Sequence, residues 1–464
     1  MVSAFLRKLR RDTEEQTRVV YPWELPSIMR KHILTGAMGT VYFALLSGMF
    51  LVAFGHRVGL KAWHWGFLSS GASLTLALQI VSAHLVAKTG NRRTLWFTAA
   101  LAGRMLRGLA VALAFWLSRG TPLAARVTFI GLLILATALE GVAAPPWFSW
   151  LADIIPREQH GRFMGRRQAW ISLANVGVVV PCGFLLDRVG EASRTPVLLA
   201  VFAFAAAVGI FDLLIHRTIP EPPMDLGEHN HFWQSVLEPL RDERFRPWLA
   251  FNALWTFSMT LGGALAMVYF VDNLGISRNF FGGSVVLIVL PLLATMLAGR
   301  RLGLLVDRHG VKRVLWWAHR VWALLPLFWI LATPSTAMLW LGAAALLGGL
   351  AGTAAFTAAG KLTTRLPQRE HVAMYVAVST CVGSVAGALG PALAGGVLYL
   401  LRDFSWQVAG ITIVGFHVIF AASLLLRNLS TLMIPRICEP APGDKVGVGA
   451  GRAEAARARS GASR

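Results

Sequence analysis

Apolar residues fill twelve long runs of this chain, and short polar segments separate them. Most runs hold about 20 residues or more, the length that a helix needs to cross the hydrocarbon core of a bilayer. Lipid offers no partner for backbone N–H and C=O groups, so the pattern predicts membrane-spanning helices. The predicted spans are 33–55, 66–87, 94–118, 127–152, 168–186, 196–215, 248–271, 280–306, 314–331, 337–360, 374–401 and 406–425.

Landmarks of the first six runs recur in the last six. The stretch Arg93-Thr-Leu-Trp96 matches Arg313-Val-Leu-Trp316, and Gly177-Val-Val-Val-Pro181 matches Gly387-Ala-Leu-Gly-Pro391. Nearly the same length of chain separates the two members of each match, so the matching parts follow one another in the same order and orientation. Parallel halves of this kind occur in secondary transporters. We therefore predict an all-α membrane protein with twelve transmembrane helices in two pseudo-symmetric six-helix halves.

The runs divide the chain into five segments. We expect a tail over 1–32, the first half over 33–215, a junction over 216–247, the second half over 248–425 and a second tail over 426–464. Apolar residues between Phe232 and Leu240 recur at spacings of three and four, which predicts a short helix in the membrane interface. The Gly/Ala/Arg-rich sequence after Pro435 predicts a largely disordered tail.

Charged residues are few and unevenly placed. The chain is 55% hydrophobic and 14% charged, with a mean hydropathy of +0.58, whereas a soluble protein carries about 25% charge. Of the 44 Lys and Arg, 33 fall on one side of the predicted bundle and 8 on the other. The positive-inside rule places the richer side, with both termini, in the cytoplasm. The net charge of +21 then reflects topology and anionic lipid, not nucleic acid, and we expect a bacterial inner (plasma) membrane protein.

A tight charged loop lies between the runs 280–306 and 314–331. It fits the pattern G-x-x-x-D-R-x-G-x-[RK]-[RK] and closely resembles the loop signature of the major facilitator superfamily, through Gly303, Asp307, Arg308, Gly310, Lys312 and Arg313. A weaker copy, at the matching place in the first half, has Ala87 where this loop has Asp307 and holds Lys88, Gly90, Arg92 and Arg93. The resemblance covers roughly residues 33–425.

The resemblance implies a fold in which the first, fourth, seventh and tenth spans line a central cavity. It also implies that the loop Asp closes the cytoplasmic side in the outward-facing state, by contacting a neighbouring helix N-terminus. Only Asp307 is available for that role, so the contact should be asymmetric. From the pseudo-symmetry of the family, we expect Asp307 near the start of the run 168–186, beside Arg166, Arg167 or Arg365.

Few ionisable residues lie within the spans, where a charge costs about 2.5–3.5 kcal/mol on insertion scales. Arg104 and Glu140 fall at equal depth near the midplane of the hairpin formed by the runs 94–118 and 127–152, and Arg107 lies one turn away. We expect Arg104 and Glu140 to form a buried ion pair. It is either a proton-coupling or solute-binding group, or a structural lock between two helices. We expect Asp212 to pair with basic neighbours at its helix end, His216 or Arg217.

Other polar and aromatic residues are candidates to shape the cavity: Tyr42, Gln79, Asn175, Asn252 and Trp255. The stretch Gly183-Phe-Leu-Leu-Asp187-Arg188-Val-Gly190 imitates the loop signature on the opposite side of the membrane, but no basic pair follows it. We interpret it as a helix end and a turn. Three cysteines form no framework, and His229 and His231 lack a third ligand at suitable spacing, so we predict no metal site and no cofactor.

The sequence thus predicts a secondary transporter that moves a small solute by alternating access. It holds no nucleotide-binding loop of the G-x-x-x-x-G-K-[ST] type and no nucleophile–base set, so we expect neither direct ATP drive nor an enzyme. Few ionisable groups line the expected cavity, which favours a neutral, amphipathic or single-charge solute. The alternatives are a proton-driven exporter of apolar compounds and a non-transporting membrane sensor or scaffold on the same fold. Expected partners are the solute, protons and membrane lipids, and we expect a monomer.

Overall fold

The structure is a computed structural model that describes residues 17–224, 232–366, 372–408 and 411–439. Within these residues, twelve helices are long and apolar enough to cross a membrane. The chain is therefore a multi-pass integral membrane protein with the predicted number of spans. The predictions on His229 and His231, and on the tail after residue 439, fall outside the described residues.

Six spans form the N-terminal half. The first span is interrupted at Leu46 and Ser47, and the second at Leu76 and Ala77, so each consists of two helices. The other four spans are continuous. In chain order the helices are α2 (Leu25–Leu45), α3 (Gly48–Arg57), α4 (Ala62–Thr75), α5 (Leu78–Thr89), α6 (Arg92–Leu117), α7 (Pro122–Ile154), α8 (Arg157–Arg188) and α9 (Glu191–His216).

The C-terminal half repeats this order after a short helix, α10 (Phe232–Arg241), which lies where the sequence predicts one. Its place at the membrane interface stays a prediction. The eighth span contains a π-helical turn between two α-helical parts, and the ninth is interrupted at Leu324. The helices are α11 (Arg246–Asp272), η1 (Ile276–Arg278), α12 (Phe280–Ser284), η2 (Val285–Val289), α13 (Leu290–His309), α14 (Val311–Ala323), α15 (Leu325–Leu331), α16 (Ala337–Arg365), α17 (Val372–Leu400), α18 (Gly415–Thr431) and η3 (Ile434–Arg436).

The last span differs from the prediction at both ends. Residues expected to begin the helix at Trp406 instead form an antiparallel hairpin of β1 (Ser405–Val408) and β2 (Ile411–Val414), in which Trp406 pairs with Ile413. The segment is apolar but rich in β-branched residues, which favour strands, and hydropathy alone does not separate the two states. The helix α18 then extends to Thr431, and the buried Ile434 and Ile437 continue the core of this half.

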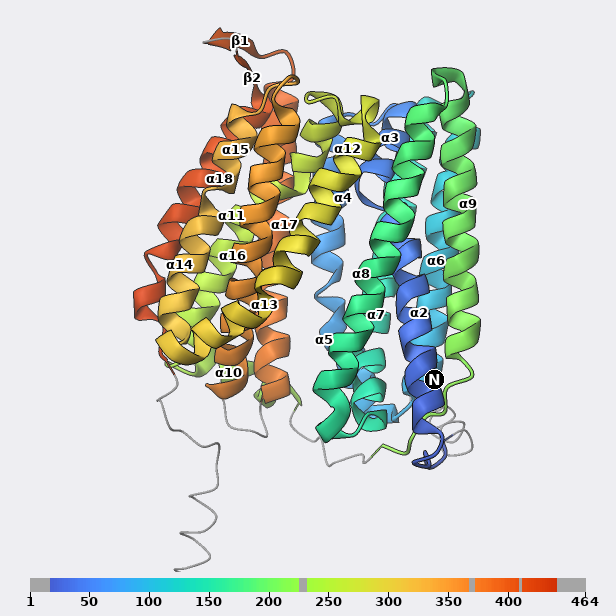
Figure 1. The fold of residues 1–464 in the computed structure, drawn as a ribbon, viewed down its shortest axis with the longest axis vertical. Helices are drawn as coiled ribbons and strands as arrows, with labels where there is room; N and C mark the ends of the chain where they lie inside the picture. The colour runs from blue at the N-terminus through green and yellow to red at the C-terminus, as the bar shows by residue number, and fades with distance from the viewer. Residues whose placement is uncertain (1–16, 225–231, 367–371, 409–410, 440–464) are drawn as a thin grey trace, which may run out of the picture.

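The two halves stand side by side in Figure 1, with the N-terminal half in blue and green and the C-terminal half in yellow and orange. We term the end that carries α10 and the start of α2 the base, and the end that carries the β-hairpin the top. The longer helices run between these two ends. Each loop between spans therefore lies at either the base or the top, so the distance of a charged residue from each end follows from its position along its helix.

The contacts that join the halves gather toward the top. There α4 packs against α17, and a Cβ atom on Gly66 would lie 2.7 Å from the Cα of Gly395. The Ser70 hydroxyl donates to the Ala388 carbonyl at 2.6 Å. On the opposite edge α8 meets α12, where a Cβ on Gly183 would lie 2.9 Å from the Phe280 carbonyl oxygen. Glycines of the eleventh and fifth spans thus permit close packing, as expected of small residues in membrane helices.

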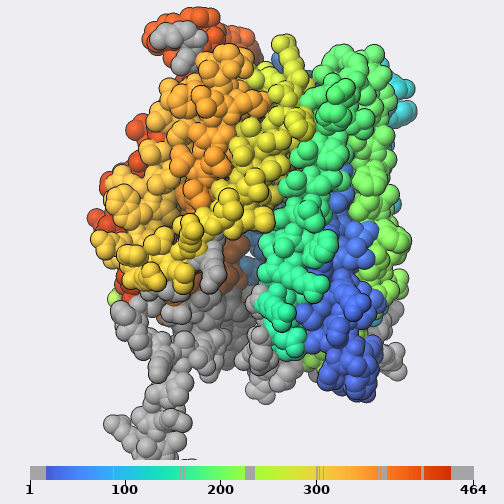
Figure 2. Space-filling view, viewed as in Figure 1, coloured from blue at the N-terminus to red at the C-terminus, as the bar shows by residue number. Residues whose placement is uncertain are grey.

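The halves separate toward the base. In Figure 2, α8 (green) touches the yellow helices in the upper part of the molecule, and the surface is hollowed between the halves lower down. The structure is therefore closed at the top, and the space between the halves opens toward the base.

Candidate functional site

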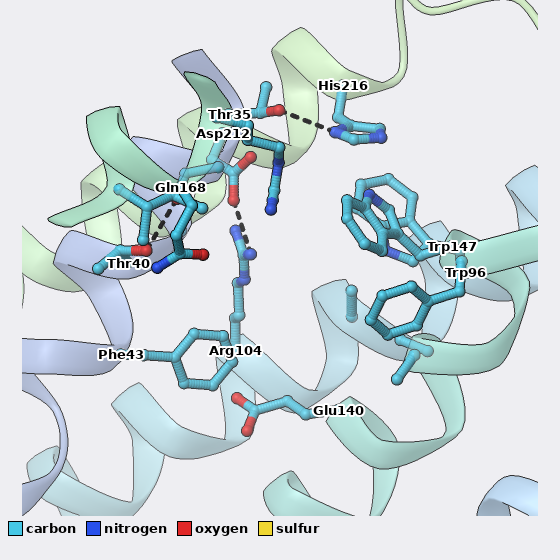
Figure 3. A pocket seen from close by; sticks show the side chains of 18 of the residues that line it. Thr35, Thr40, Phe43, Trp96, Arg104, Glu140, Trp147, Gln168, Asp212 and His216 are labelled. Atoms are coloured by element: carbon cyan, nitrogen blue, oxygen red, sulfur yellow. Dashed lines mark hydrogen bonds and ion pairs between the residues drawn. The ribbon is translucent and has the colours of Figure 1, made fainter. Parts of the chain in front are cut away.

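A pocket of about 490 Å³ lies inside the N-terminal half, among α2, α6, α7, α8 and α9. Its volume falls in the range of small-molecule sites, roughly 300–1,000 Å³. Its residues extend from His216 and Trp96, near the base ends of their helices, to Phe43 and Glu140, about halfway along the first and fourth spans (Figure 3). Its lining is mainly apolar, but both carboxylates predicted for the first half, Glu140 and Asp212, are present.

Glu140 is held by two residues from neighbouring helices. Arg107 on α6 donates from Nε to Oε1 at 3.1 Å and from Nη2 to Oε2 at 2.5 Å. The Tyr42 hydroxyl on α2 donates to Oε1 at 2.8 Å. Arg107 and Tyr42 are buried, so the carboxylate exchanges hydration for charge-assisted hydrogen bonds. Three sequence candidates, Glu140, Arg107 and Tyr42, therefore form one network.

Arg104 pairs with Asp212 instead of Glu140. Its Nη2 lies 2.7 Å from Oδ2 of Asp212, and its Nη1 donates to the Gly209 carbonyl. The predicted Arg104–Glu140 pair is therefore wrong, and so is the prediction that Asp212 pairs with His216 or Arg217. Asp212 is buried, which makes the ion pair part of the interior.

Side-chain direction explains the exchange of partners. A Cβ on Gly103 would lie 2.9 Å from Cγ of Glu140, so the depth match in the hairpin is correct. Side chains on a helix lean toward its N-terminus. Arg104 on the rising α6 therefore leans toward the base, whereas Glu140 on the descending α7 leans toward the top. Glu140 meets Arg107, one turn higher, and Arg104 meets Asp212 on α9.

The sequence repeat contained a signal for the second pair. Arg320 and Asn428 follow Arg104 and Asp212 at one common offset, so they occupy the corresponding places of the C-terminal half. Nη1 of Arg320 contacts Oδ1 of Asn428 at 3.5 Å. Both halves thus join their third and sixth spans by an Arg in the same register, but only the N-terminal half uses a carboxylate. The ionisable pocket is a property of one half.

Aromatic residues and a further arginine line the walls of the pocket. In Figure 3 Trp96 and Trp147 lie on one side, with Gln168, Thr40 and Phe43 on the other. Arg167 on α8 also lines the pocket, and its guanidinium lies over the Trp147 ring, 4.8 Å from the centroid. Nδ1 of His216 contacts the Thr35 hydroxyl at 3.0 Å, and its Nε2 is buried without a partner among the described residues.

The remaining cavity candidates lie apart from this pocket. Gln79 is half-buried on α5, and Oδ1 of Asn175 on α8 is buried without a described partner. In the C-terminal half, Nδ2 of Asn252 donates to the Ser379 carbonyl at 2.9 Å, while Trp255 is packed against His319 with ring centroids 4.4 Å apart. Asn252 and Trp255 therefore act within C-terminal half packing, and a role toward a solute stays a prediction for these four residues.

One arginine inside the C-terminal half was missed. Arg427, which the charge count assigned to the tail, lies on α18 and is fully buried. It donates to the carbonyls of Trp322 and Met259 at 3.3 and 3.1 Å and lies over the Trp329 ring. Its neighbours are neutral backbone and aromatic groups of α11, α14 and α15, which is a structural arrangement.

Each of the two loop copies turns at a glycine with positive φ. Gly90 and Gly310 have φ of 67° and 83°, in the region that favours glycine, and each separates two helices. Each following helix N-terminus is capped by a glutamate from beyond the last span of its half. Glu221 accepts from the Arg92 N–H at 3.0 Å, and Glu439 accepts from the Lys312 N–H at 3.2 Å. The two glutamates thus occupy corresponding places of the two halves, which adds another landmark to the repeat.

The basic residues of the first copy have structural partners. Arg92 is fully buried between Glu221 and Asp153. Arg93 donates to the Arg217 carbonyl, and Lys88 is exposed on α5. In the second copy the side chain of Asp307 falls outside the described residues, and so does that of its expected neighbour Arg365, so the contact expected for Asp307 stays a prediction. Arg308 is exposed at the end of α13.

The stretch that imitates the loop signature holds an unexpected contact at the top. Asp187 lies at the end of α8, and Gly190 precedes α9, as predicted for a helix end and a turn. However, its carboxylate accepts hydrogen bonds from the N–H groups of Phe280 and Phe281, at 2.9 and 2.8 Å. Asp187 therefore caps the eighth span across the two halves, and it contributes to the closed top.

The fold and the pocket together define a class of protein: a membrane bundle of two related halves, closed at one end, with a charged pocket within one half. The chain matches the family model of the Major Facilitator Superfamily over residues 102–302 and 255–436. These ranges cover more than half of its length, and the chain belongs to this superfamily. It is a transporter and not an enzyme. A search of the curated proteins found no match to the chain.

Solved structures of transporters share the fold. The nucleoside transporter NupG superposes with a TM-score of 0.61 at 12% identity, covering 88% of this chain and 98% of that one. The inward open conformation of the xylose transporter XylE from E. coli gives 0.62 at 16% identity, covering 91% and 98%. A bacterial homologue of the human lysosomal transporter Spinster, inward-facing and unoccupied, gives 0.55 at 15%, covering 90% and 95%.

Proposed function

We propose that the protein is a secondary transporter that moves a small solute by alternating access, and that the pocket of the N-terminal half is its solute site. The observation that carries this proposal is the conjunction of two carboxylates and three arginines with an apolar cavity inside a membrane bundle. Ionisable groups at such depth are expensive and are characteristic of substrate and ion pathways. The asymmetry between the halves supports one site in the N-terminal half.

The state of the molecule fits one step of such a cycle. The base carries the excess of Lys and Arg, which supports a cytoplasmic base and cytoplasmic termini. The top is closed by α4 against α17 and by α8 against α12, which supports the assignment of an inward-facing state. XylE and the Spinster homologue have been solved in inward-facing forms of the same fold.

A second candidate function adds protons as the coupling ion. Glu140 accepts from both Arg107 and Tyr42, so its protonation would release two partners on two helices at once. Tyr42 lies on α2 and Glu140 lies on α7, and both helices line the pocket. Loss of their hydrogen bond would therefore affect the pocket wall. The observation favours proton coupling over a role for Glu140 as a structural lock alone.

The experiment is solute flux in proteoliposomes that contain the purified protein. Compounds that raise its melting temperature are tested for uptake with and without an imposed pH gradient. The transporter function predicts saturable uptake above that of protein-free liposomes. If Glu140 couples transport to protons, Glu140→Gln should keep exchange of labelled for unlabelled solute but lose gradient-driven accumulation. Binding without any flux would instead indicate a non-transporting sensor.

A further inference from the structure

The charges around the pocket do not balance. Two arginines are paired, Arg104 with Asp212 and Arg107 with Glu140. Among the described residues no carboxylate lies within ion-pair distance of the third, Arg167. The cluster of these five groups therefore carries one positive charge in excess. An arginine without a counter-ion is costly inside a membrane protein unless water or an anion reaches it.

Neutral contacts hold the Arg167 guanidinium in place. Its Nε donates to the His32 carbonyl at 3.3 Å, and its plane lies over Trp147. Gly36 on α2 lies against the group: a Cβ there would lie 2.7 Å from Nη2, so a side chain at this position would displace the guanidinium. A guanidinium has five N–H donors, and the described contact uses one. Nη1 and Nη2 therefore remain for a ligand, in the forked geometry that suits a carboxylate.

The walls around this cation are aromatic and apolar. Trp96, Trp147, Phe43 and Phe148 line the same pocket. The buried His216 also lies on this lining, and its Nε2 has no partner among the described residues. Glu140 and Asp212 also line this pocket, and their carboxylates would repel a second negative charge on a ligand. The site is thus suited to one anionic group attached to an apolar, planar body.

We propose that the pocket binds a small aromatic monoanion, with its anionic group on Arg167 and its ring against the tryptophan-lined wall. This inference rests on the proposed function, because it names the substrate class of the same site. The sequence favoured a neutral, amphipathic or single-charge solute, and this inference selects the single-charge class.

An anionic lipid headgroup would supply the same chemistry to Arg167, so the test separates the two sources. Binding is measured by calorimetry on protein in neutral detergent, with indole-3-acetate and benzoate as the anions and their amides as neutral isosteres. A parallel arm uses nanodiscs of phosphatidylcholine with and without phosphatidylglycerol. The protein variants are Arg167→Gln, Arg167→Lys and, as a matched control, Arg166→Gln, whose side chain is exposed on the same helix.

The proposal predicts that at least one acid binds about tenfold more tightly than its amide, as expected for one charge-assisted contact. Arg167→Gln should remove this preference and Arg166→Gln should retain it. Arg167→Lys should retain part of it, because the charge remains while the fork is lost. If Arg167→Gln does not fold, the acid–amide comparison on the natural protein still decides the question.

Several results overturn the proposal. They are equal binding of acid and amide, no binding of either acid, a preference that survives Arg167→Gln, and stabilisation by phosphatidylglycerol alone. The flux of each bound compound in proteoliposomes is measured separately, and it tests the proposed function independently of the substrate class. Transport of a neutral compound would leave the proposed function intact while the substrate class fails. Absence of flux for every bound compound would remove the proposed function itself.

Discussion

Removing the Asp187 carboxylate should open the top of the molecule. Asp187 on α8 accepts the N–H groups of Phe280 and Phe281 at the start of α12, so the contact joins the two halves and exists only while they touch. The N–H of Gly282 is accepted by Asn279 from the same segment. Loss of Asp187 thus leaves two of the first three N–H groups of this helix to water, without disturbing the helix within its own half.

The size of the effect follows from helix capping. A lost N-cap costs about 0.5–2 kcal/mol, and a charge at a helix N-terminus contributes about 0.3–1 kcal/mol. For Asp187→Ala we expect about 2 kcal/mol, or about 30-fold in the equilibrium between closed and open top. A top-open form populated at about 1% would rise to about a quarter. Asp187→Asn keeps one acceptor and should shift the equilibrium about fivefold.

The assay is pulsed electron spin resonance between nitroxide labels placed at Arg119 and Phe404, on the top loops of the two halves. The three native cysteines are first replaced by serine. The matched control is Asp403→Asn. Asp403 follows Asp187 at the same offset as Asn428 follows Asp212, but it is 89% exposed and pairs with its neighbour Arg402 at 3.2 Å. We expect a longer-distance population for Asp187→Ala only. An unchanged distribution, or an equal change for Asp403→Asn, would refute the capping argument.

Further predictions concern the pocket, the base loop and the topology. Arg107→Leu should destabilise the protein by about 3–5 kcal/mol, because it leaves Glu140 buried without its cation. Replacing both Arg107 and Glu140 by leucine should recover part of this loss in thermal unfolding. Additive losses would show that the two residues do not interact. Asp307→Asn should act oppositely to Asp187→Ala and favour the base-open form. Combined with Asp187→Ala, it should reduce the long-distance population that the same spin labels report; no reduction would limit the loop to a topological anchor. A reporter fused after Arg119 should be extracytoplasmic, and a cytoplasmic signal there would contradict the assigned orientation of the first half.

The number of spans, the two halves and the turns at Gly90 and Gly310 followed from the sequence because they depend on local properties. Hydropathy sets the length of each span, and the repeat doubles every landmark. The predicted start of the last span was wrong for the same reason. The segment from Trp406 to Val414 is as apolar as a membrane helix, but its β-branched residues form strands. Composition alone does not choose between these states.

The sequence singled out three ionisable residues of the pocket, Arg104, Glu140 and Asp212, but not their pairing, and it did not predict Arg167 or the aromatic residues as parts of the pocket. Glu140 and Arg104 are rare charges at midplane depth, and that depth was correct. The partner of Arg104 depended on side-chain direction and on α9, which is distant from α6 along the chain. Comparison of the halves would have found it, because Arg320 and Asn428 repeat the pair in the other half. The partner of Asp187 depends on the closed top, a property of one conformation that no sequence pattern encodes.

The central claim, that a transported solute occupies the pocket of the N-terminal half, is tested most directly by protection of one cysteine. Ala144 lines this pocket on α7, and Ala144→Cys is made in a protein whose Cys182, Cys381 and Cys438 are serine. Labelling by a small maleimide is followed at increasing concentrations of the solute that the proteoliposomes take up. The account predicts protection with the same half-saturating concentration as transport. Labelling that is unaffected while uptake is saturated would place the solute elsewhere and contradict it.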